Sequence, residues 1–380
     1  MKRRYNNSFR GKLMKIIPQF KGIIDFLSVT KRDISDNQVS KLNREDRRQF
    51  KKIKVLFEIN QVETLKIIDK IEAEKTLILD YVLVSQDMKI IDRPYNLIYN
   101  YATKKYEPCL VILFAIILVN GEKYPINFDF WISEYMLEEN ETYLSKNQIA
   151  KNMVEKLVNT GLKVDNCLMD AGFNCDYLIQ YLNDKNIEYT CRAAKNKSYK
   201  SDLGKSTAKA LFMDEYNGEY YFYKKAGYMN KKTVDFCGKE STLVVISNSR
   251  EKLMNRDFYC LISTETKTYT EIFRSYKNRF KIEVFFRNMK SYIGLGSSRT
   301  HNEDKISNHI SLCIFGYIMV EILSKKIKKT FFQTLMYIQT EQRSTLERKL
   351  YPIFKKVKGI IEKSAFQPPY HAKISLLSSF

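Results

Sequence analysis

The chain has 380 residues and carries 64 Lys and Arg against 43 Asp and Glu, a formal net charge of +21. Its 44% hydrophobic content excludes a disordered tail, and its 13 Gly and 7 Pro exclude collagen-like and low-complexity chains. The length predicts two or three domains. The basic excess lies mainly in residues 1–70 and 301–380, whereas residues 71–300 are nearly balanced. Basic ends and an aromatic-rich composition, with 26 Tyr and 23 Phe, favour a nucleic-acid partner.

Neither a zinc site nor a membrane segment is indicated. Seven Cys without a Cys-x-x-Cys pair, together with only three His, favour buried thiols in a reducing cytosol. The longest apolar run, 109–119, is shorter than the about 20 residues that span a bilayer and favours a buried strand. Polar residues interrupt the stretch 306–323, which favours a core helix. Residues 1–20 lack the apolar core of a secretion signal. No amphipathic helix with a clean basic face plus lipidation signal is evident, so no membrane partner is expected.

Taken in chain order, residues 1–70 are expected to be mostly helical. From residue 76 the pattern changes, because 76–84 and 109–119 are apolar runs rich in residues that favour strands. A third strand is predicted at 124–131, after a turn at Asn120-Gly121, which is a strong hairpin dipeptide.

Helices and strands alternate after this hairpin. A helix predicted at 145–160 precedes a strand at 164–170, a second helix and a strand at 187–193. This order predicts a parallel crossover and therefore an α/β fold with a mixed sheet. Residues 195–265 return to strand-like patterns, and a long helix is predicted from about Thr270 into a helical C-terminal region.

Three acidic residues occupy unusual positions. Asp80 lies within the apolar strand 76–84, Asp170 ends the strand 164–170, and Glu283 lies on the helix predicted to follow. A carboxylate inside or at the tip of an apolar strand is costly unless it is paired or binds a metal. Carboxylate oxygens suit Mg²⁺, and two such ions can support phosphoryl transfer. No P-loop and no Ser or Cys nucleophile with a His partner is evident.

The helix around Glu283 has a polar face. At about 100° per residue, one arc of roughly 80° holds a tyrosine, a glutamate and three cations. These residues are Tyr276, Arg279, Glu283, Arg287 and Lys290. One carboxylate among cations suits a metal ligand beside a bound phosphate chain. The alternative is a solvated face stabilised by i,i+4 ion pairs.

The run YKNRFKIEVFFRNMK, which begins at Tyr276, matches the Y-R-E-K signature of bacterial insertion-sequence transposases. The sequence resembles the family named after insertion sequence four. LILDYVLVSQ around Asp80 and CLMDAGFNCDYLIQYL around Asp170 resemble that family's two aspartate blocks. The resemblance covers about residues 76–300.

The resemblance implies a ribonuclease-H-like catalytic domain at 71–300, with a β-rich insertion at about 195–265. The helical, basic region 1–70 would recognise DNA ends. The helical, basic region 301–380 would make dimer or DNA contacts. Such an enzyme is a DNA transposase of the bacterial cytoplasm, associated with the nucleoid. Its expected partners are double-stranded DNA with terminal inverted repeats, target DNA and a second copy of the chain.

The implied DDE triad is Asp80, Asp170 and Glu283, which would hold Mg²⁺, with Mn²⁺ as a substitute. By analogy, the DNA-binding residues of the signature would be Tyr276, Arg279 and Lys290. Arg287 shares their helix face. Further backbone contacts are expected where cations follow the strand after Asp170, at Arg192, Lys195 and Lys197.

Two departures from the family pattern concern aromatic residues. Many relatives carry a second Asp where this chain has Tyr81, outside the triad. Some relatives use a Trp in the insertion to hold an extruded base, but the only Trp here is Trp131. Tyr216, Tyr220 or Tyr223 would stack instead, or the excision route differs; ordinary sheet packing explains these tyrosines equally well.

Two other functions remain open at this point. A related metal-dependent nuclease would cut DNA without joining strands. A decayed or domesticated copy would bind DNA without catalysis.

Overall fold

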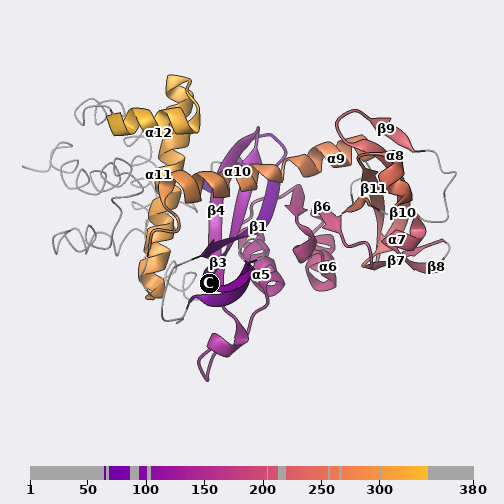
Figure 1. The fold of residues 1–380 in the computed structure, drawn as a ribbon, viewed down its shortest axis with the longest axis horizontal. Helices are drawn as coiled ribbons and strands as arrows, with labels where there is room; N and C mark the ends of the chain where they lie inside the picture. Colours follow the sequence, from indigo (N-terminus) through magenta and orange to yellow (C-terminus); the bar gives the residue numbers. More distant parts are fainter. Residues whose placement is uncertain are drawn as a thin grey trace, which may run out of the picture. The chain divides into compact units, whose positions relative to one another are not determined.

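The structure is a computed structural model, and it describes most of the central part of the chain (Figure 1). The described residues are 64–65, 68–85, 94–100, 104–202, 204–212, 220–255, 257–264, 268–298 and 301–340. Almost all of the helical region predicted at 1–70, and residues 341–380 of the region predicted at 301–380, lie outside them. The described chain forms two compact units. The first unit contains parts of residues 83–110 and 285–340, and the second contains residues 65–82 and 111–284.

The second unit is built on the predicted mixed sheet. Its first strands are β1 (Thr76–Ser85), β3 (Lys105–Val119), β4 (Glu122–Trp131), β5 (Asn166–Met169) and β6 (Glu188–Ala193). Residues 83–85 of β1 and 105–110 of β3 belong to the first unit. They lie in the order β3-β1-β5-β6, with β4 paired to β3. The β1–β5 and β5–β6 pairs are parallel, which confirms the predicted crossover. The hairpin is also confirmed, with left-handed φ values of 51° at Asn120 and 81° at Gly121.

Two helices and the sheet enclose the main core of this unit. They are α5 (Lys146–Asn159), close to the predicted 145–160, and α6 (Asp176–Asp184), the second predicted helix (Figure 1). Ser145 and Gln148 form a capping box that satisfies orphan backbone donors where α5 begins. Alternate residues of β1, such as Leu77 and Leu79, are buried in the same apolar cluster as the inner faces of both helices. The intervening residues of β1 therefore point to the opposite face of the sheet.

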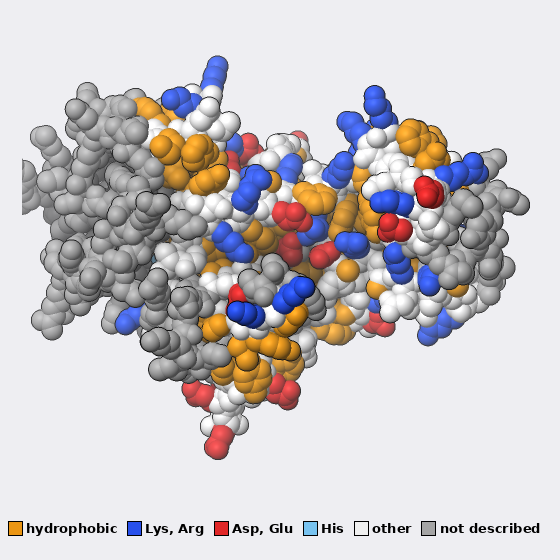
Figure 2. Space-filling view, in the orientation of Figure 1, with side chains coloured by type: hydrophobic (Ala, Val, Ile, Leu, Met, Phe, Trp, Pro, Cys, Tyr) orange, Lys and Arg blue, Asp and Glu red, His pale blue; other side chains and the backbone are white. Residues whose placement is uncertain are grey.

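The predicted β-rich insertion continues the same sheet. Its strands are β7 (Ser198–Ser201), β8 (Gly204–Thr207), β9 (Tyr221–Tyr223), β10 (Gly227–Phe236), β11 (Lys239–Ser247) and β12 (Tyr259–Ser263). β12 pairs with β6, and the order continues through β11, β10 and β7 to β8. Two short helices, α7 (Ala208–Leu211) and α8 (Arg250–Met254), were not predicted. Lys and Arg side chains are spread over the face of this region that Figure 2 shows.

The prediction of a single long helix from about Thr270 is wrong. The segment instead forms α9 (Tyr269–Lys277) and α10 (Phe280–Asn288), followed by a π-helical turn, η3 (Met289–Ile293). At the break, Arg279 N donates to Tyr276 O over 2.9 Å and Ile282 N donates to Arg279 O over 3.0 Å. These i→i−3 bonds tighten the backbone locally, whereas apolar periodicity alone cannot distinguish two short helices from one long helix.

The first unit contains a hairpin-like strand pair and helices. β2 (Asn96–Asn100), which was not predicted, pairs antiparallel with the start of β3. The helices α11 (Glu303–Ile327) and α12 (Phe331–Thr340) confirm the helical character predicted for this part of the chain. Among the described helices, α11 is long and apolar enough to cross a membrane, but 67% of its apolar window is buried inside the protein. This burial supports the core-helix interpretation.

We predict that Gly227→Ala destabilises the protein strongly. Gly227 has a φ of 96°, and an added Cβ would lie 2.2 Å from the backbone oxygen of Ser247 on the paired strand. Gly238→Ala is a matched control, because its φ is 78° but a Cβ would meet nothing within 4 Å. The control should lose about 1–2 kcal/mol for the left-handed backbone alone. Urea unfolding should show a clearly larger loss for Gly227→Ala, and equal losses would contradict the clash.

Candidate active site

The parallel register of β1 and β5 brings two of the predicted acidic residues together. Leu79 on β1 pairs with Met169 on β5, so Asp80 and Asp170 occupy the next matched positions. Neighbouring strands are about 4.8 Å apart, and matched residues point to the same face. Asp80 therefore belongs to the face opposite the α5–α6 core. The same register continued onto β6 places Arg192 in this row.

Asp80 is a buried carboxylate, with only 8% of its surface exposed. Burial raises the pKa of Asp80 to about 6, although the nearby Arg279 guanidinium lowers it. The negative charges of Asp170 and Glu283 raise the pKa further. The backbone N–H of Tyr81 donates to Asp80 Oδ1 over 2.9 Å. Asp170 and Glu283 are thus close enough to Asp80 to act on it electrostatically.

Arg279 connects two of these carboxylates directly. Its Nη1 donates to Asp80 Oδ2 over 2.6 Å, and its Nη2 donates to Glu283 Oε1 over 2.5 Å. Burial opposes the charge of Arg279, but Tyr276 and the three surrounding carboxylates outweigh it and raise the pKa of the guanidinium. The side chains of Arg279 and Asp80 are 9% and 11% exposed, whereas that of Glu283 is 46% exposed. The cation therefore bridges the sheet and α10.

The donor set suits a hard divalent cation, because it consists of carboxylate oxygens. Asp80 and Glu283 already meet around one positive group. Within the described ranges, however, no three His, Cys, Asp or Glu side chains are close enough together to hold one metal ion. The chemistry fits Mg²⁺, while the arrangement shown has a guanidinium between two of the three carboxylates.

Tyr276 does not lie on the polar face that the helical arc predicted. It is only 6% exposed and belongs to an apolar cluster with Ile272 and Phe273. The guanidinium carbon of Arg279 lies 5.6 Å from the Tyr276 ring centre and 5.5 Å from that of Phe280. The break before α10 explains the difference, because the arc assumed an uninterrupted helix.

The other predicted DNA contacts are distributed over both units. Arg192 is exposed and lies 5.6 Å from the ring centre of Tyr259, and Lys195 lies 4.9 Å from that of Phe258. Arg287 and Lys290 are exposed residues of the first unit. Their roles remain predictions.

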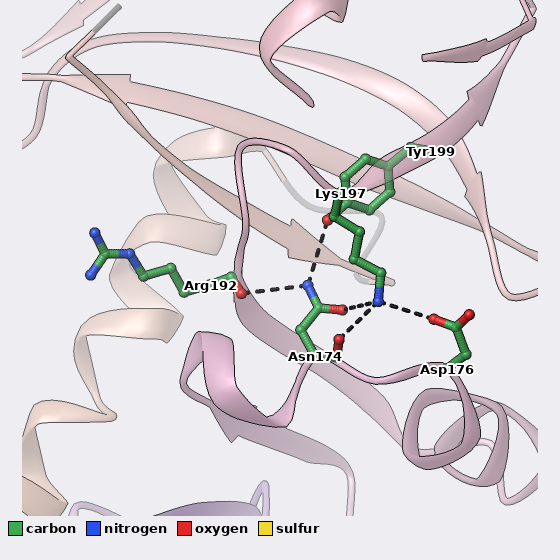
Figure 3. A network of polar contacts seen from close by, with 5 residues as sticks. All are labelled: Asn174, Asp176, Arg192, Lys197 and Tyr199. Carbon is green, nitrogen blue, oxygen red and sulfur yellow. Dashed lines mark hydrogen bonds and ion pairs between the residues drawn. The ribbon is translucent and has the colours of Figure 1, made fainter. Parts of the chain in front are cut away.

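Lys197 is part of a polar network within the second unit (Figure 3). Its Nζ donates to Asn174 O over 2.8 Å, to Asn174 Oδ1 over 3.1 Å and to Asp176 Oδ1 over 3.0 Å. Asn174 Nδ2 in turn lies 3.5 Å from both Arg192 O and the Tyr199 hydroxyl. The network joins the segment after the second aspartate to β6 and β7.

This network gives Lys197 a structural task. An ammonium group has three N–H donors, and these three contacts use all of them. The DNA contact predicted for Lys197 remains untested, but the geometry favours positioning of the Asp170 segment. Asn174 belongs to this network, but no spacing pattern in the sequence identifies it.

The structure also shows where Tyr81 and Trp131 lie, the two aromatic residues that differ from the pattern of the resembled family. Tyr81 packs on the α5–α6 side, 6.2 Å from the Phe173 ring and 4.5 Å from Lys146 Nζ. Its ring is therefore on the face opposite Asp80, as its exclusion from the triad requires. Trp131 lies on β4, with its ring 4.6 Å from Lys146 Nζ.

The tyrosines proposed for base stacking differ in exposure. Tyr216 lies outside the described residues. Tyr220 packs against the main core, whereas the Tyr223 hydroxyl accepts a 3.1 Å bond from Arg274 Nε. Tyr221 and Phe222 on the same strand are 48% and 57% exposed.

One comparison with known proteins bears on this site. Residues 141–319 match the family described as the transposase DDE domain. The matched segment is slightly less than half of the chain and includes Asp170 and Glu283, but it begins after Asp80. No match is found among the curated proteins.

We predict that Lys197→Met lowers the free energy of unfolding by more than it lowers the free energy of DNA binding. The substitution leaves the two Asn174 oxygens without their donor, which should cost about 1–3 kcal/mol. Asp176→Asn is the control; because Asp176 is 72% exposed, its ion pair should contribute little. Urea unfolding and DNA binding should be measured on the same samples. Unchanged stability with weakened DNA binding would instead support the predicted DNA contact.

Proposed function

We propose that the protein is a DDE-type DNA transposase that cleaves and joins phosphodiesters at the ends of a mobile element. The observation that carries the proposal is the alignment of Asp80 with Asp170 on parallel strands, with Glu283 joined to Asp80 through Arg279. The match of residues 141–319 to the transposase DDE domain supports it independently.

Asp80, Asp170 and Glu283 would hold the divalent ions, Mg²⁺ or Mn²⁺. Bound ions would stabilise the attacking and leaving oxygens of an in-line displacement. The buried setting of Asp80 strengthens its electrostatic interactions with any cation. Arg279 would contribute a fixed positive charge beside the reacting phosphate.

The order β3-β1-β5-β6, with β4 beside β3 and helices on one face, supports the ribonuclease-H-like core implied by the resemblance. The insertion adds a basic surface (Figure 2). DNA would pass along the row of Asp80, Asp170 and Arg192, where the exposed guanidinium of Arg192 can reach a phosphate. Terminal inverted repeats, target DNA and a homodimer on paired ends follow from the resemblance and complete the proposal.

We predict that Glu283→Gln abolishes metal-dependent nicking of DNA that carries the element ends, while DNA binding is retained. Loss of one carboxylate charge removes a metal ligand without changing side-chain size. Glu240→Gln is the control, because Glu240 is an exposed residue of β11. Strand cleavage with Mg²⁺ should be measured on gels alongside binding. Equal cleavage by wild type and Glu283→Gln would show that the proposed triad is wrong.

Transfer of a labelled end into target DNA separates the two enzymatic functions. Joined products support a transposase, whereas cleavage without joining indicates a nuclease. Binding without cleavage by the wild type in Mg²⁺ or Mn²⁺ indicates a non-catalytic protein.

We predict that Arg192→Gln lowers the salt dependence of DNA binding. Loss of one phosphate contact should reduce the slope of log affinity against log salt by about 0.9. Lys163→Gln is a matched control, because Lys163 is 82% exposed but precedes β5, at the strand end opposite Asp170. Fluorescence anisotropy at several salt concentrations measures the slope. A slope equal to that of the control would remove Arg192 from the DNA path.

A further inference from the structure

Arg279 occupies the position where the proposed function requires a metal ion. Its guanidinium bonds oxygen atoms of Asp80 and Glu283, two of the three proposed ligands. A hydrogen-bonded cation and a metal ion cannot both use these oxygens in the same geometry. A metal ion bound to these oxygens would therefore require Arg279 to move.

We infer that Arg279 is an internal cation that keeps Asp80 and Glu283 together until a divalent ion replaces it, and that the released guanidinium then binds a DNA phosphate. This inference rests on the proposed function. It assigns Arg279 a positioning role that precedes any contact with DNA.

The need for such a cation follows from electrostatics. Asp80 is buried, and Arg279 bonds it together with Glu283. Without a positive group between them the two carboxylates would repel each other, and a divalent ion that bound there would relieve this repulsion. The guanidinium offsets two negative charges with two short bonds, and its planar fork suits this bridge better than an ammonium group.

Two features would favour an exchange of partners by the guanidinium. The Glu283 side chain is 46% exposed, so solvent reaches the outer partner of Arg279. Arg279 Nε is buried without a hydrogen-bond acceptor, so the present arrangement leaves one donor unsatisfied. The rings of Tyr276 and Phe280, 5.6 and 5.5 Å from the guanidinium carbon, make cation–π contacts that would keep the group close to the site during the exchange.

If Arg279 exchanged carboxylates for a phosphate, the binding of metal and the binding of DNA would be coupled. A metal ion would free Arg279 for phosphate, and a phosphate would draw Arg279 away from the carboxylates. Metal and DNA would therefore each strengthen the binding of the other by the same factor. The metal site would then be filled preferentially when DNA is present, which limits unproductive metal binding.

The test is titration of the full chain with Mn²⁺ by isothermal calorimetry at pH 8, comparing wild type with Arg279→Gln. In the absence of DNA, Arg279→Gln should bind Mn²⁺ more tightly, by about 5- to 100-fold, because the competing cation is gone. Arg274→Gln is the matched control; Arg274 is on α9 and its Nε donates to the Tyr223 hydroxyl. It should leave the Mn²⁺ affinity unchanged.

A second measurement uses a duplex of random sequence, which offers phosphates without element ends. DNA should raise the Mn²⁺ affinity of the wild type, and Arg279→Gln should lose most of this increase. Arg279→Lys serves if Arg279→Gln does not fold, because it keeps the charge but not the bridging fork. Its Mn²⁺ affinity without DNA should also exceed that of the wild type.

The outcomes distinguish this inference from the proposed function. Suppose that the wild type binds Mn²⁺ and that Glu283→Gln weakens this binding. If both Arg279 variants then bind Mn²⁺ no more tightly than the wild type, the inference alone is overturned. An absence of Mn²⁺ binding by the wild type and by both variants would overturn the inference and the proposed metal site together.

Discussion

The negative charges of Asp80 on β1, Asp170 after β5 and Glu283 on α10 repel one another, and this repulsion is the constraint on which the site depends. The parallel register of β1 and β5 fixes Asp80 beside Asp170, and burial makes the charge of Asp80 costly. Arg279 offsets this cost by bonding Asp80 and Glu283 at once. The same bonds connect the start of α10 to β1, so the ion pairs of Arg279 both offset the carboxylate charges and hold α10 against the sheet.

Different parts of the fold position the acidic and the basic side chains around this contact. The α5–α6 core supports one face of the sheet, which leaves the opposite face of β1 and β5 for acidic side chains. The insertion extends the sheet through the β6–β12 pair and carries basic side chains. The Asn174–Lys197 network links the segment after Asp170 to the beginning of that insertion. The strand that bears the second aspartate is thus connected to the surface on which DNA would lie.

The chemistry of the site suits phosphoryl transfer because the protein supplies charge and position rather than a nucleophile. Carboxylates provide hard oxygen ligands, and Arg279 and Arg192 provide cations that match phosphate. If Arg279 exchanges carboxylate for phosphate as inferred, DNA would influence the binding of a metal ion by the carboxylates.

The sequence by itself determined the local elements and the candidate acidic residues. The strands around Asp80 and Asp170, the Asn120-Gly121 hairpin and the capped helix α5 follow from period-2 and period-3.6 patterns and from turn chemistry, all of which act between near neighbours. Only the tertiary structure decided the break at Arg279, the burial of Tyr276 and the internal bonding of Lys197. Each of these depends on distant partners; Arg279 and Asp80, for example, are 199 positions apart, and patterns among near neighbours do not specify which distant charges will pair.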